Sequence, residues 1–196
     1  MEIFSQKMPI VVAIDELKAK QLTIGLVPTM GALHQGHLAL VKKSLNENDR
    51  VVVSIFVNPT QFDNKEDLIK YPRTLEDDVA LLKTVSKDKI LVYAPTVEDI
   101  YEGNTLSQSF DFDGLEFEME GKFRNGHFDG VGTIVKRFFE IVKPHRAYFG
   151  EKDFQQLAII KKLVEKHNMP LKIIGCPIYR ETNGLAMSSR NTRLKP

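Results

Sequence analysis

The sequence predicts an α/β fold of the doubly wound, Rossmann-like type, built around a parallel sheet. Short runs of β-branched and aliphatic residues alternate with segments whose apolar residues recur at helical spacing. The strand-like runs are apolar throughout, which is typical of parallel strands covered by helices on both faces. Ligands bind such sheets outside the carboxyl ends of the strands, so the loops that follow these runs are the candidate functional segments.

The first half of the chain supplies three strands and two helices. We expect strands at residues 22–29, 51–57 and 90–95, and helices at residues 38–45 and 74–85. The second of these helices has Thr74 at its N-cap position. Asp77 stands three residues later, at the spacing of a capping box.

The second half continues the alternation after one interruption. Residues 103–126 are rich in Gly, Asp, Glu and Phe, and predict an irregular insertion. Beyond it we expect a helix at residues 131–142, a strand at 146–150, a helix at 154–167 and a strand at 171–178. His145, His167 and Cys176 belong to no motif, so we assign them to packing.

The composition predicts a cytoplasmic globular protein that binds neither nucleic acid nor membranes. The chain has 196 residues and is 42% hydrophobic, enough for one sizeable core. Its 27 basic and 26 acidic residues nearly cancel, which argues against a nucleic-acid-binding surface. One cysteine excludes an intramolecular disulfide and a cysteine-rich zinc site. The first residues lack a secretory signal pattern, and no apolar stretch approaches the roughly 20 residues of a membrane span.

The loop after the first long strand carries a dense functional signal. The segment "PTMGALHQGH" places Gly31, His34, Gly36 and His37 at the turn into a helix. The glycine spacing is similar to the start of a P-loop, but His37 and Leu38 stand where a P-loop has Lys and Ser or Thr. Glycines and free N–H groups at a helix N-terminus still indicate an anion site. Imidazoles donate hydrogen bonds and can be cationic near neutral pH, so His34 and His37 are candidates to stabilise charge on a nucleotide's phosphates.

Two later segments add hydrogen-bond donors. In "GEKD", Lys152 stands at a helix start, where the macrodipole disfavours a cation unless an anion lies nearby. Its ammonium group suits the charge that develops on an α-phosphate. In "MSSR", residues 187–190, hydroxyls and a guanidinium are donors, although the segment alone is an ordinary polar loop. A serine nucleophile is not indicated, because neither serine stands in a Gly-x-Ser-x-Gly elbow.

Six co-linear segments resemble one family. Residues 34–37, "HQGH", match the His-x-Gly-His signature of the nucleotidyltransferase superfamily that includes class I aminoacyl-tRNA synthetases. The longer string "PTMGALHQGH" resembles the pantoate–β-alanine ligases, or pantothenate synthetases. The segments "FVNPTQF", "YPRTLEDD", "RNGHFDGV", "FGEKDFQQ" and "RETNGLAMSSRN" agree with that family in order along essentially the whole chain. The resemblance implies the condensation of pantoate with β-alanine using ATP and Mg²⁺, through a pantoyl adenylate, with release of AMP and pyrophosphate.

The resemblance also assigns residues to ATP. It implies that His37 is the proton donor, that His34 assists at the phosphates, that Tyr179 lies on the adenine side, and that the loop at residues 187–190 closes over the triphosphate. The implied ATP set is Met30, Gly31, Ala32, Leu33, His34, Gln35, Gly36, His37, Gly150, Glu151, Lys152, Asp153, Tyr179, Met187, Ser188, Ser189 and Arg190. The catalytic subset is His34, His37, Lys152, Ser188, Ser189 and Arg190.

The acid substrate is assigned to amide side chains. By resemblance, Gln61 and Gln156 bind pantoate, and Gln61 also lies near β-alanine. An amide can donate to a carboxylate and accept from the hydroxyls of a hydroxy acid, which suits this task. Asn58 is expected to support the same pocket, and Arg124 and His127 to line its rim.

Asp77 and Asp78 allow two interpretations. They are candidates for a magnesium site, because Mg²⁺ binds through one or two carboxylates together with substrate phosphates. A capping interaction and a solvated helix face explain the same pair at least as well.

The family normally continues into a smaller C-terminal domain that covers the active site. We therefore expect residues 1–196 to form the nucleotide-binding catalytic domain without this lid. Two alternative functions follow. One is a domain that binds ATP and substrate with little turnover, because the lid that excludes water is missing. The other is a related nucleotidyltransferase that transfers AMP and stops there. The family also suggests a homodimer.

Overall fold

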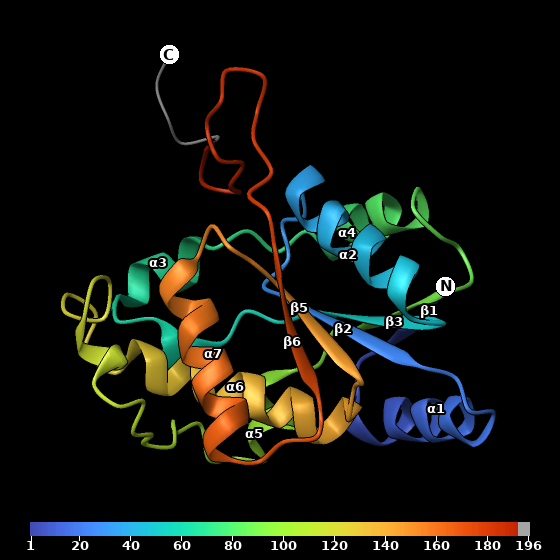
Figure 1. Cartoon of the computed structure of the whole chain (residues 1–196), viewed down its shortest axis with the longest axis horizontal. Coiled ribbons are helices and arrows are strands. Elements are labelled where there is room, and N and C mark those ends of the chain that lie inside the picture. The colour runs from blue at the N-terminus through green and yellow to red at the C-terminus, as the bar shows by residue number, and fades with distance from the viewer. Residues whose placement is uncertain (192–196) are drawn as a thin grey trace.

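Six parallel strands form one sheet in the computed structural model, which describes residues 1–191 (Figure 1). The strands are β1 (Glu2–Phe4), β2 (Ile24–Thr29), β3 (Arg50–Ile55), β4 (Ile90–Tyr93), β5 (Arg146–Gly150) and β6 (Lys172–Cys176). Their order is β1-β4-β3-β2-β5-β6, and each neighbouring pair runs parallel. The predicted doubly wound, Rossmann-like sheet is confirmed.

The direction of winding changes between β2 and β5. The chain passes from β2 outward to β3 and β4, and then returns to the other side of β2 to add β5 and β6. At such a switch point the loops after the two central strands diverge and leave a crevice for a ligand. The glycine–histidine loop follows β2, and the segment 150–153 ends β5, so both loops flank this crevice.

Helices cover both faces of the sheet (Figure 1). They are α1 (Lys7–Ala19), α2 (Gln35–Glu47), α3 (Lys65–Lys70), α4 (Leu75–Lys83), α5 (Val97–Tyr101), α6 (His127–Val142) and α7 (Phe154–Lys166), with short turns η1 (Pro59–Gln61) and η2 (Leu115–Phe117). Helices α2 and α4 share one apolar layer with the strands, and α1, α6 and α7 share the other. Alternate residues of β3 serve the two layers: Val51 and Val53 join the first, and Val52 the second. This explains why the strands are apolar throughout.

Helix α2 lies unusually close to β2. A Cβ atom on Gly25 would stand 2.1 Å from Ser44 Oγ, so only glycine fits at this crossing. This crossing lies near the start of β2 and the end of α2, while Leu38 and Val41 bury the first half of α2 in the same apolar layer. The core therefore holds α2 along its length, and with it His34 and His37 at the switch point.

The sequence does not predict β1 or α1. Residues 8–14 are almost all apolar, so no helical face stands out from the pattern. In the structure only Ile10 and Ile14 of this helix are fully buried, one turn apart. Packing of α1 against α6 thus selects the helical conformation that the local pattern leaves undecided.

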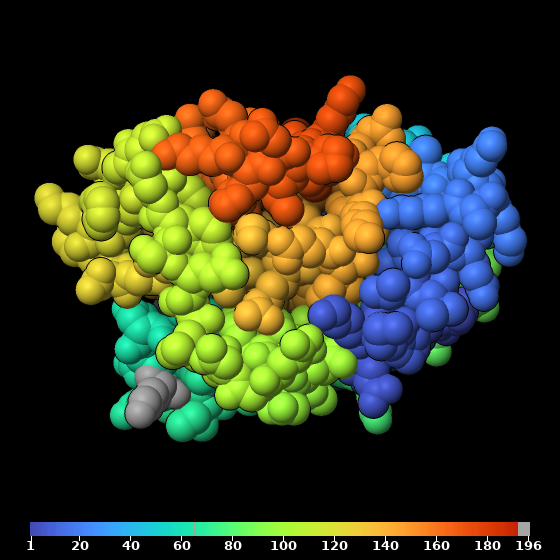
Figure 2. Space-filling view, turned by 90° about the horizontal axis from the view of Figure 1, so that it is seen from below, coloured from blue at the N-terminus to red at the C-terminus, as the bar shows by residue number. Residues whose placement is uncertain are grey.

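Residues 103–126 form an irregular segment that contains the short turn η2. Gln155, at the start of α7, fastens it to the fold: its Nε2 donates to the carbonyls of Leu115 (2.7 Å) and Glu118 (2.6 Å), and its Oε1 accepts from the N–H of Glu120 (2.9 Å). In Figure 2 this segment, lime to yellow, lies against α7, in orange. The N–H of Gly121 also donates to Gln155 Oε1, at 3.4 Å. A buried amide that satisfies four backbone groups gives the irregular segment a defined position.

Candidate active site

A cavity of about 490 Å³ lies at the switch point, beside the ends of β2 and β5. Most of the residues singled out from the sequence line it. They are Met30, His34, Gly36, His37, Asn58, Gln61, Arg124, His127, Gly150, Lys152, Asp153, Gln156, Tyr179, Met187, Ser188, Ser189 and Arg190. Segments far apart in the sequence thus meet around one space that is large enough for a small-molecule ligand.

Other predicted residues lie outside this lining: Gly31, Ala32, Leu33, Gln35, Glu151, Asp77 and Asp78. Gln35 and Glu151 are exposed on the surface, and Gly31 lines a neighbouring cavity of about 330 Å³. The backbone N–H groups of Ala32 and Leu33 donate to the carboxylate of Asp78, at 3.1 and 2.7 Å. The glycine loop therefore turns two of its N–H groups toward a protein carboxylate.

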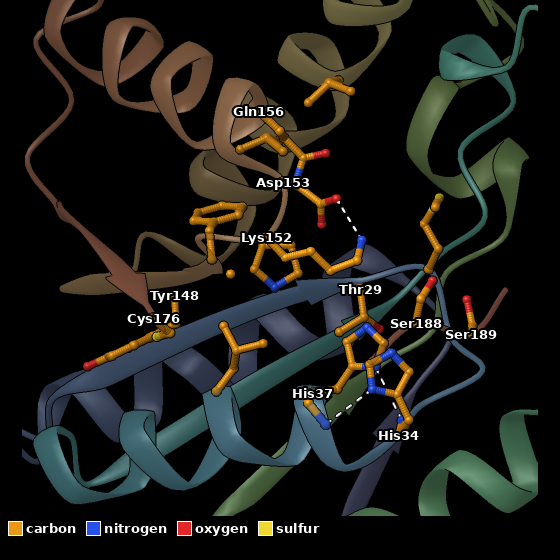
Figure 3. A pocket seen from close by; sticks show the side chains of 18 of the residues that line it. Thr29, His34, His37, Tyr148, Lys152, Asp153, Gln156, Cys176, Ser188 and Ser189 are labelled. Carbon is orange, nitrogen blue, oxygen red and sulfur yellow. Dashed lines mark hydrogen bonds and ion pairs between the residues drawn. The ribbon is translucent and has the colours of Figure 1, made fainter. Parts of the chain in front are cut away.

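His34 and His37 form a reciprocal cap at the start of α2 (Figure 3). His37 Nδ1 accepts from the backbone N–H of His34 at 3.2 Å, and His34 Nδ1 accepts from that of Gly36 at 3.1 Å. Because each Nδ1 accepts, each neutral ring carries its proton on Nε2. The ring centroids lie 4.0 Å apart, and both rings line the cavity. The loop thus holds two Nε2–H donors side by side.

The protein environment disfavours the cationic form of both imidazoles. Burial lowers the pKa of His37 to about 3, and the positive charges of His34 and Lys152 act in the same direction. Burial also lowers the pKa of His34, with Lys152 adding to the effect and Glu181 opposing it. At neutral pH the His37 ring of the free protein is therefore a neutral hydrogen-bond donor. The expectation that this imidazole can be cationic near neutral pH does not hold for the free protein.

Lys152 stands at the turn between β5 and α7 and lines the same cavity as the histidine pair (Figure 3). Its Nζ lies 3.1 Å from Asp153 Oδ1, in an ion pair whose side chains are 38% and 55% exposed. Asp153 supplies the negative charge that a cation at a helix N-terminus requires. Exposed pairs of this kind are weak, so Lys152 can exchange its partner for a ligand anion.

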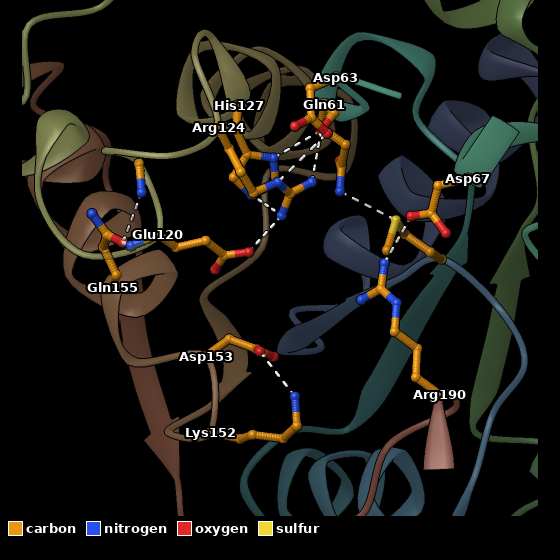
Figure 4. A network of polar contacts seen from close by, with 12 residues as sticks. Gln61, Asp63, Asp67, Glu120, Arg124, His127, Lys152, Asp153, Gln155 and Arg190 are labelled. Atoms are coloured by element: carbon orange, nitrogen blue, oxygen red, sulfur yellow. Dashed lines mark hydrogen bonds and ion pairs between the residues drawn. The ribbon is translucent and has the colours of Figure 1, made fainter. Parts of the chain in front are cut away.

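A chain of hydrogen bonds sets the orientation of the Gln61 side chain. Figure 4 shows Gln61 beside Arg124 and His127. Asn58 Nδ2 donates to the backbone carbonyl of Gly130 and to Gln61 Oε1, both at 3.1 Å. Tyr101 OH donates to Asn58 Oδ1 at 2.6 Å. Since a backbone carbonyl only accepts, Gly130 fixes the amide of Asn58, and Asn58 in turn occupies the oxygen of Gln61. This orientation turns the NH₂ group of Gln61 toward Met30 Sδ, at 3.2 Å, where it can donate to a ligand.

Arg124 and His127 both donate hydrogen bonds to the backbone carbonyl of Gln61, from Arg124 Nη2 at 3.2 Å and from His127 Nδ1 at 2.8 Å. His127 donates from Nδ1, so its Nε2 accepts from Arg124 Nη1 at 3.2 Å. Burial lowers the pKa of His127, and the hydrogen bond to Gln61 opposes this. Arg124 also pairs with Glu120 at 2.5 Å within the irregular segment, and its bond to the Gln61 carbonyl ties that segment to η1.

The segment 187–190 is held against α3. Arg190 Nη2 lies 3.1 Å from Asp67 Oδ2, and the hydroxyl of Tyr71 is hydrogen-bonded to the side chain of Ser189. The backbone N–H of Met187 donates to the carbonyl of Tyr179 at 2.9 Å. These contacts bring the loop across the cavity from α7.

The sequence interpretation missed the apolar wall of the cavity. The unpredicted lining includes Phe56, Phe62, Tyr71, Val131, Ile134, Phe138, Tyr148, Phe149 and Ile178. Tyr148 and Phe149 directly precede the "GEKD" segment, so their place at a strand end was a usable signal. Cys176, assigned to packing, is 5% exposed and also borders the cavity. Burial raises the pKa of its thiol to about 11, so the thiol is protonated at neutral pH.

Thr74, Asp77 and Asp78 differ from the sequence expectation. The predicted capping box is wrong, since the Thr74 side chain caps no backbone N–H and instead donates to Asp78 Oδ2 at 3.3 Å. Asp77 is exposed, whereas Asp78 is 2% exposed. Across residues 1–191, no three His, Cys, Asp or Glu side chains come together as a metal-binding group. Nor does this part of the chain contain a helix long and apolar enough to cross a membrane.

A parallel α/β sheet with a cavity at its switch point, flanked by a His-x-Gly-His turn, is typical of nucleotide-binding enzymes of the Rossmann-like class. The chain belongs to the pantoate-beta-alanine ligase family, whose model matches residues 2–196. It is 66% identical over 194 residues to the pantothenate synthetase of Flavobacterium psychrophilum, covering 99% of this chain and 68% of that protein. The pantothenate synthetase of Christiangramia forsetii is 58% identical with the same coverage.

Solved structures agree with this assignment. The crystal structure of pantoate-beta-alanine ligase from Francisella tularensis, complexed with beta-gamma ATP and beta-alanine, matches with a TM-score of 0.93 and 43% identity. The match covers 100% of this chain and 74% of that one. Pantothenate synthetase from Thermus thermophilus matches with a TM-score of 0.86 and 45% identity, over 100% of this chain and 68% of that one.

Proposed function

We propose that this chain catalyses the ATP-dependent condensation of pantoate with β-alanine to pantothenate. The observation that carries the proposal is that one cavity is lined by donors suited to phosphates, His34, His37 and Lys152, and also by the Gln61 amide. Family membership and the relative crystallised with ATP and beta-alanine support the same reaction.

In the first step, a carboxylate oxygen of pantoate attacks the α-phosphorus of ATP. The bond from that phosphorus to the β-phosphate oxygen breaks, and pyrophosphate leaves. His34 and His37 donate from Nε2 to the phosphate oxygens, and Lys152 releases Asp153 to neutralise the developing charge. A phosphate beside His37 favours its cationic form, which makes proton donation to the leaving group available in the loaded site.

Gln61 and Gln156 are proposed to hold pantoate. Asn58 orients the oxygen of Gln61 toward itself, so Gln61 presents its NH₂ group, which suits a carboxylate or another acceptor oxygen. Gln156, also in the cavity lining, is the candidate to accept from the hydroxyls of the acid. In this proposal one amide donates to the acid and the other accepts from it, whereas the sequence attributes both roles to either one.

In the second step, the amine nitrogen of β-alanine attacks the acyl carbon of the adenylate. The bond from this carbon to the AMP oxygen breaks, the nitrogen loses a proton to solvent, and AMP leaves. No protein nucleophile is needed, so the site acts through positioning and charge neutralisation. Ser188, Ser189 and Arg190 are proposed to donate to the triphosphate, and the Tyr179 backbone to lie on the adenine side.

Mg²⁺ is proposed to enter with ATP, neutralising phosphate charge as it commonly does with substrate phosphates. The buried Asp78 already accepts three hydrogen bonds and is poorly suited to bind Mg²⁺. Asp153, which lines the cavity beside Lys152, is the carboxylate proposed to lie near the metal ion. We further propose, from family likeness, that residues 1–196 are the nucleotide-binding catalytic domain and that the protein is a cytoplasmic homodimer.

The decisive assay follows pyrophosphate and AMP release with ATP, Mg²⁺ and pantoate, with and without β-alanine. We expect pantoate to trigger pyrophosphate release and β-alanine to trigger AMP release. Pyrophosphate release that is independent of pantoate would instead indicate a different nucleotidyltransferase. ATP binding without pyrophosphate release would indicate a binding domain.

A further inference from the structure

The glycine loop between β2 and α2 has an unusual backbone. Gly31 has φ +83°, and the next residue, Ala32, has φ +50°, in the left-handed region that residues with a Cβ rarely adopt. The N–H groups of Ala32 and Leu33 both point to one carboxylate, as successive backbone amides do in the concave sites that bind anions. The loop therefore has the form of an anion-binding site.

The anion in this site is a side chain of the protein. Asp78 Oδ2 accepts from the N–H of Ala32 at 3.1 Å, and Asp78 Oδ1 accepts from that of Leu33 at 2.7 Å. The carboxylate is 2% exposed and comes from α4, which is 45 residues further along the chain. A phosphate cannot use the same two donors while Asp78 holds them.

We propose that Asp78 is a positioning residue for the reaction, which fixes the loop so that His34 and His37 face the phosphates of ATP. The role rests on the proposed function. Asp78 touches neither imidazole: it acts through the backbone of residues 31–33, whose turn leads directly into the histidine cap at the start of α2. In this assignment the two loop N–H groups bind the Asp78 carboxylate, and the phosphates of ATP are bound by the imidazoles and by Lys152.

The test compares three conservative variants by steady-state pyrophosphate release and amide hydrogen exchange. In Asp78→Asn, the amide has one oxygen for two N–H groups, so one contact is lost. We expect kcat to fall by about tenfold to a hundredfold while the Mg²⁺ concentration for half-maximal rate stays unchanged. Glu76→Gln, which removes an exposed charge from the same first turn of α4, leaves the rate unchanged. Asp77→Asn leaves the Mg²⁺ dependence unchanged.

Amide hydrogen exchange in the wild-type chain tests the contact between Asp78 and the loop N–H groups without a variant. The amides of Ala32 and Leu33 are expected to be protected, and to stay protected when ATP is added. Exchange as fast as in an open loop would overturn the proposal, even if Asp78→Asn failed to fold. A wild-type rate in folded Asp78→Asn would overturn it too, as would a raised Mg²⁺ requirement in both Asp77→Asn and Asp78→Asn. If wild type releases no pyrophosphate, the proposed function fails, and with it the positioning role, although the protected amides still report the contact.

Discussion

Asn58 donates from its Nδ2 to Gln61 Oε1 at 3.1 Å, and this hydrogen bond decides which group Gln61 offers to a ligand. Asn58 is 1% exposed and cannot turn over, because the same NH₂ group also donates to the Gly130 carbonyl. One backbone carbonyl on α6 thus determines the polarity of a binding group on η1. Such a relay gives specificity because each member is satisfied in only one orientation.

Asn58→Asp reverses this relay. A carboxylate oxygen in place of Nδ2 cannot donate to Gln61 or Gly130, so Gln61 loses its fixed orientation. Leaving buried partners mispaired costs about 1–3 kcal/mol, and we expect the KM for pantoate to rise roughly ten- to a hundredfold. Asn64→Asp is the matched control, because Asn64 uses its oxygen to cap α3 and aspartate keeps that oxygen. Equal KM values for the two variants would refute the relay.

His37 can be dissected with two isosteric replacements. Asn retains an acceptor near the Nδ1 position, which keeps the bond from His34, but lacks the Nε2–H donor. Removing a donor to transition-state charge typically costs about a hundredfold to a thousandfold, which we expect for pyrophosphate release by His37→Asn. His37→Gln, whose amide reaches the Nε2 position, should lose less. His145→Asn is the control, since His145 uses Nδ1 only to accept from Ile24. A loss as large in His145→Asn would argue against a specific role.

The free protein should lose stability as the solution becomes acidic. The folded state holds the pKa of His37 at about 3, below the 6.5 of the unfolded chain, so it excludes a proton that the unfolded chain binds. This contribution is fully present above pH 6.5 and is lost as the pH falls toward 3, with a slope of up to about 1.4 kcal/mol per pH unit. Urea unfolding at several pH values should show a shallower slope in His37→Asn. Identical slopes would mean that His37 titrates normally.

Gln155 and Gln156 should separate stability from substrate binding. Gln155→Glu removes the NH₂ group that serves Leu115 and Glu118, so we expect a loss of about 1–3 kcal/mol of unfolding free energy. Gln156→Glu, one residue away in the cavity lining, should fold normally but repel the pantoate carboxylate and raise its KM. Calorimetric unfolding and a pantoate titration distinguish them. A stability loss in Gln156→Glu together with a raised KM for pantoate in Gln155→Glu would contradict both assignments.

The sequence predicted most of the sheet because its strands are buried on both faces and therefore apolar throughout. It predicted the loops that meet at the cavity because parallel strands bring their carboxyl ends together. It could not predict that Asp78 bonds Leu33, or that Asn58 bonds Gly130, because these contacts join segments 45 and 72 residues apart. The neutral state of His37 was likewise out of reach, since burial in the folded protein causes it.

We expect the imidazoles of His34 and His37, the ammonium group of Lys152 and the oriented amide of Gln61 to surround the reacting atoms in one cavity. A crystal structure with pantoate and a non-hydrolysable α,β-methylene ATP analogue tests this expectation most directly. We predict the α-phosphate within hydrogen-bonding distance of His37 Nε2 and Lys152 Nζ, and a pantoate oxygen on Gln61 Nε2. A nucleotide bound outside this cavity, or pantoate away from Gln61, would contradict the account.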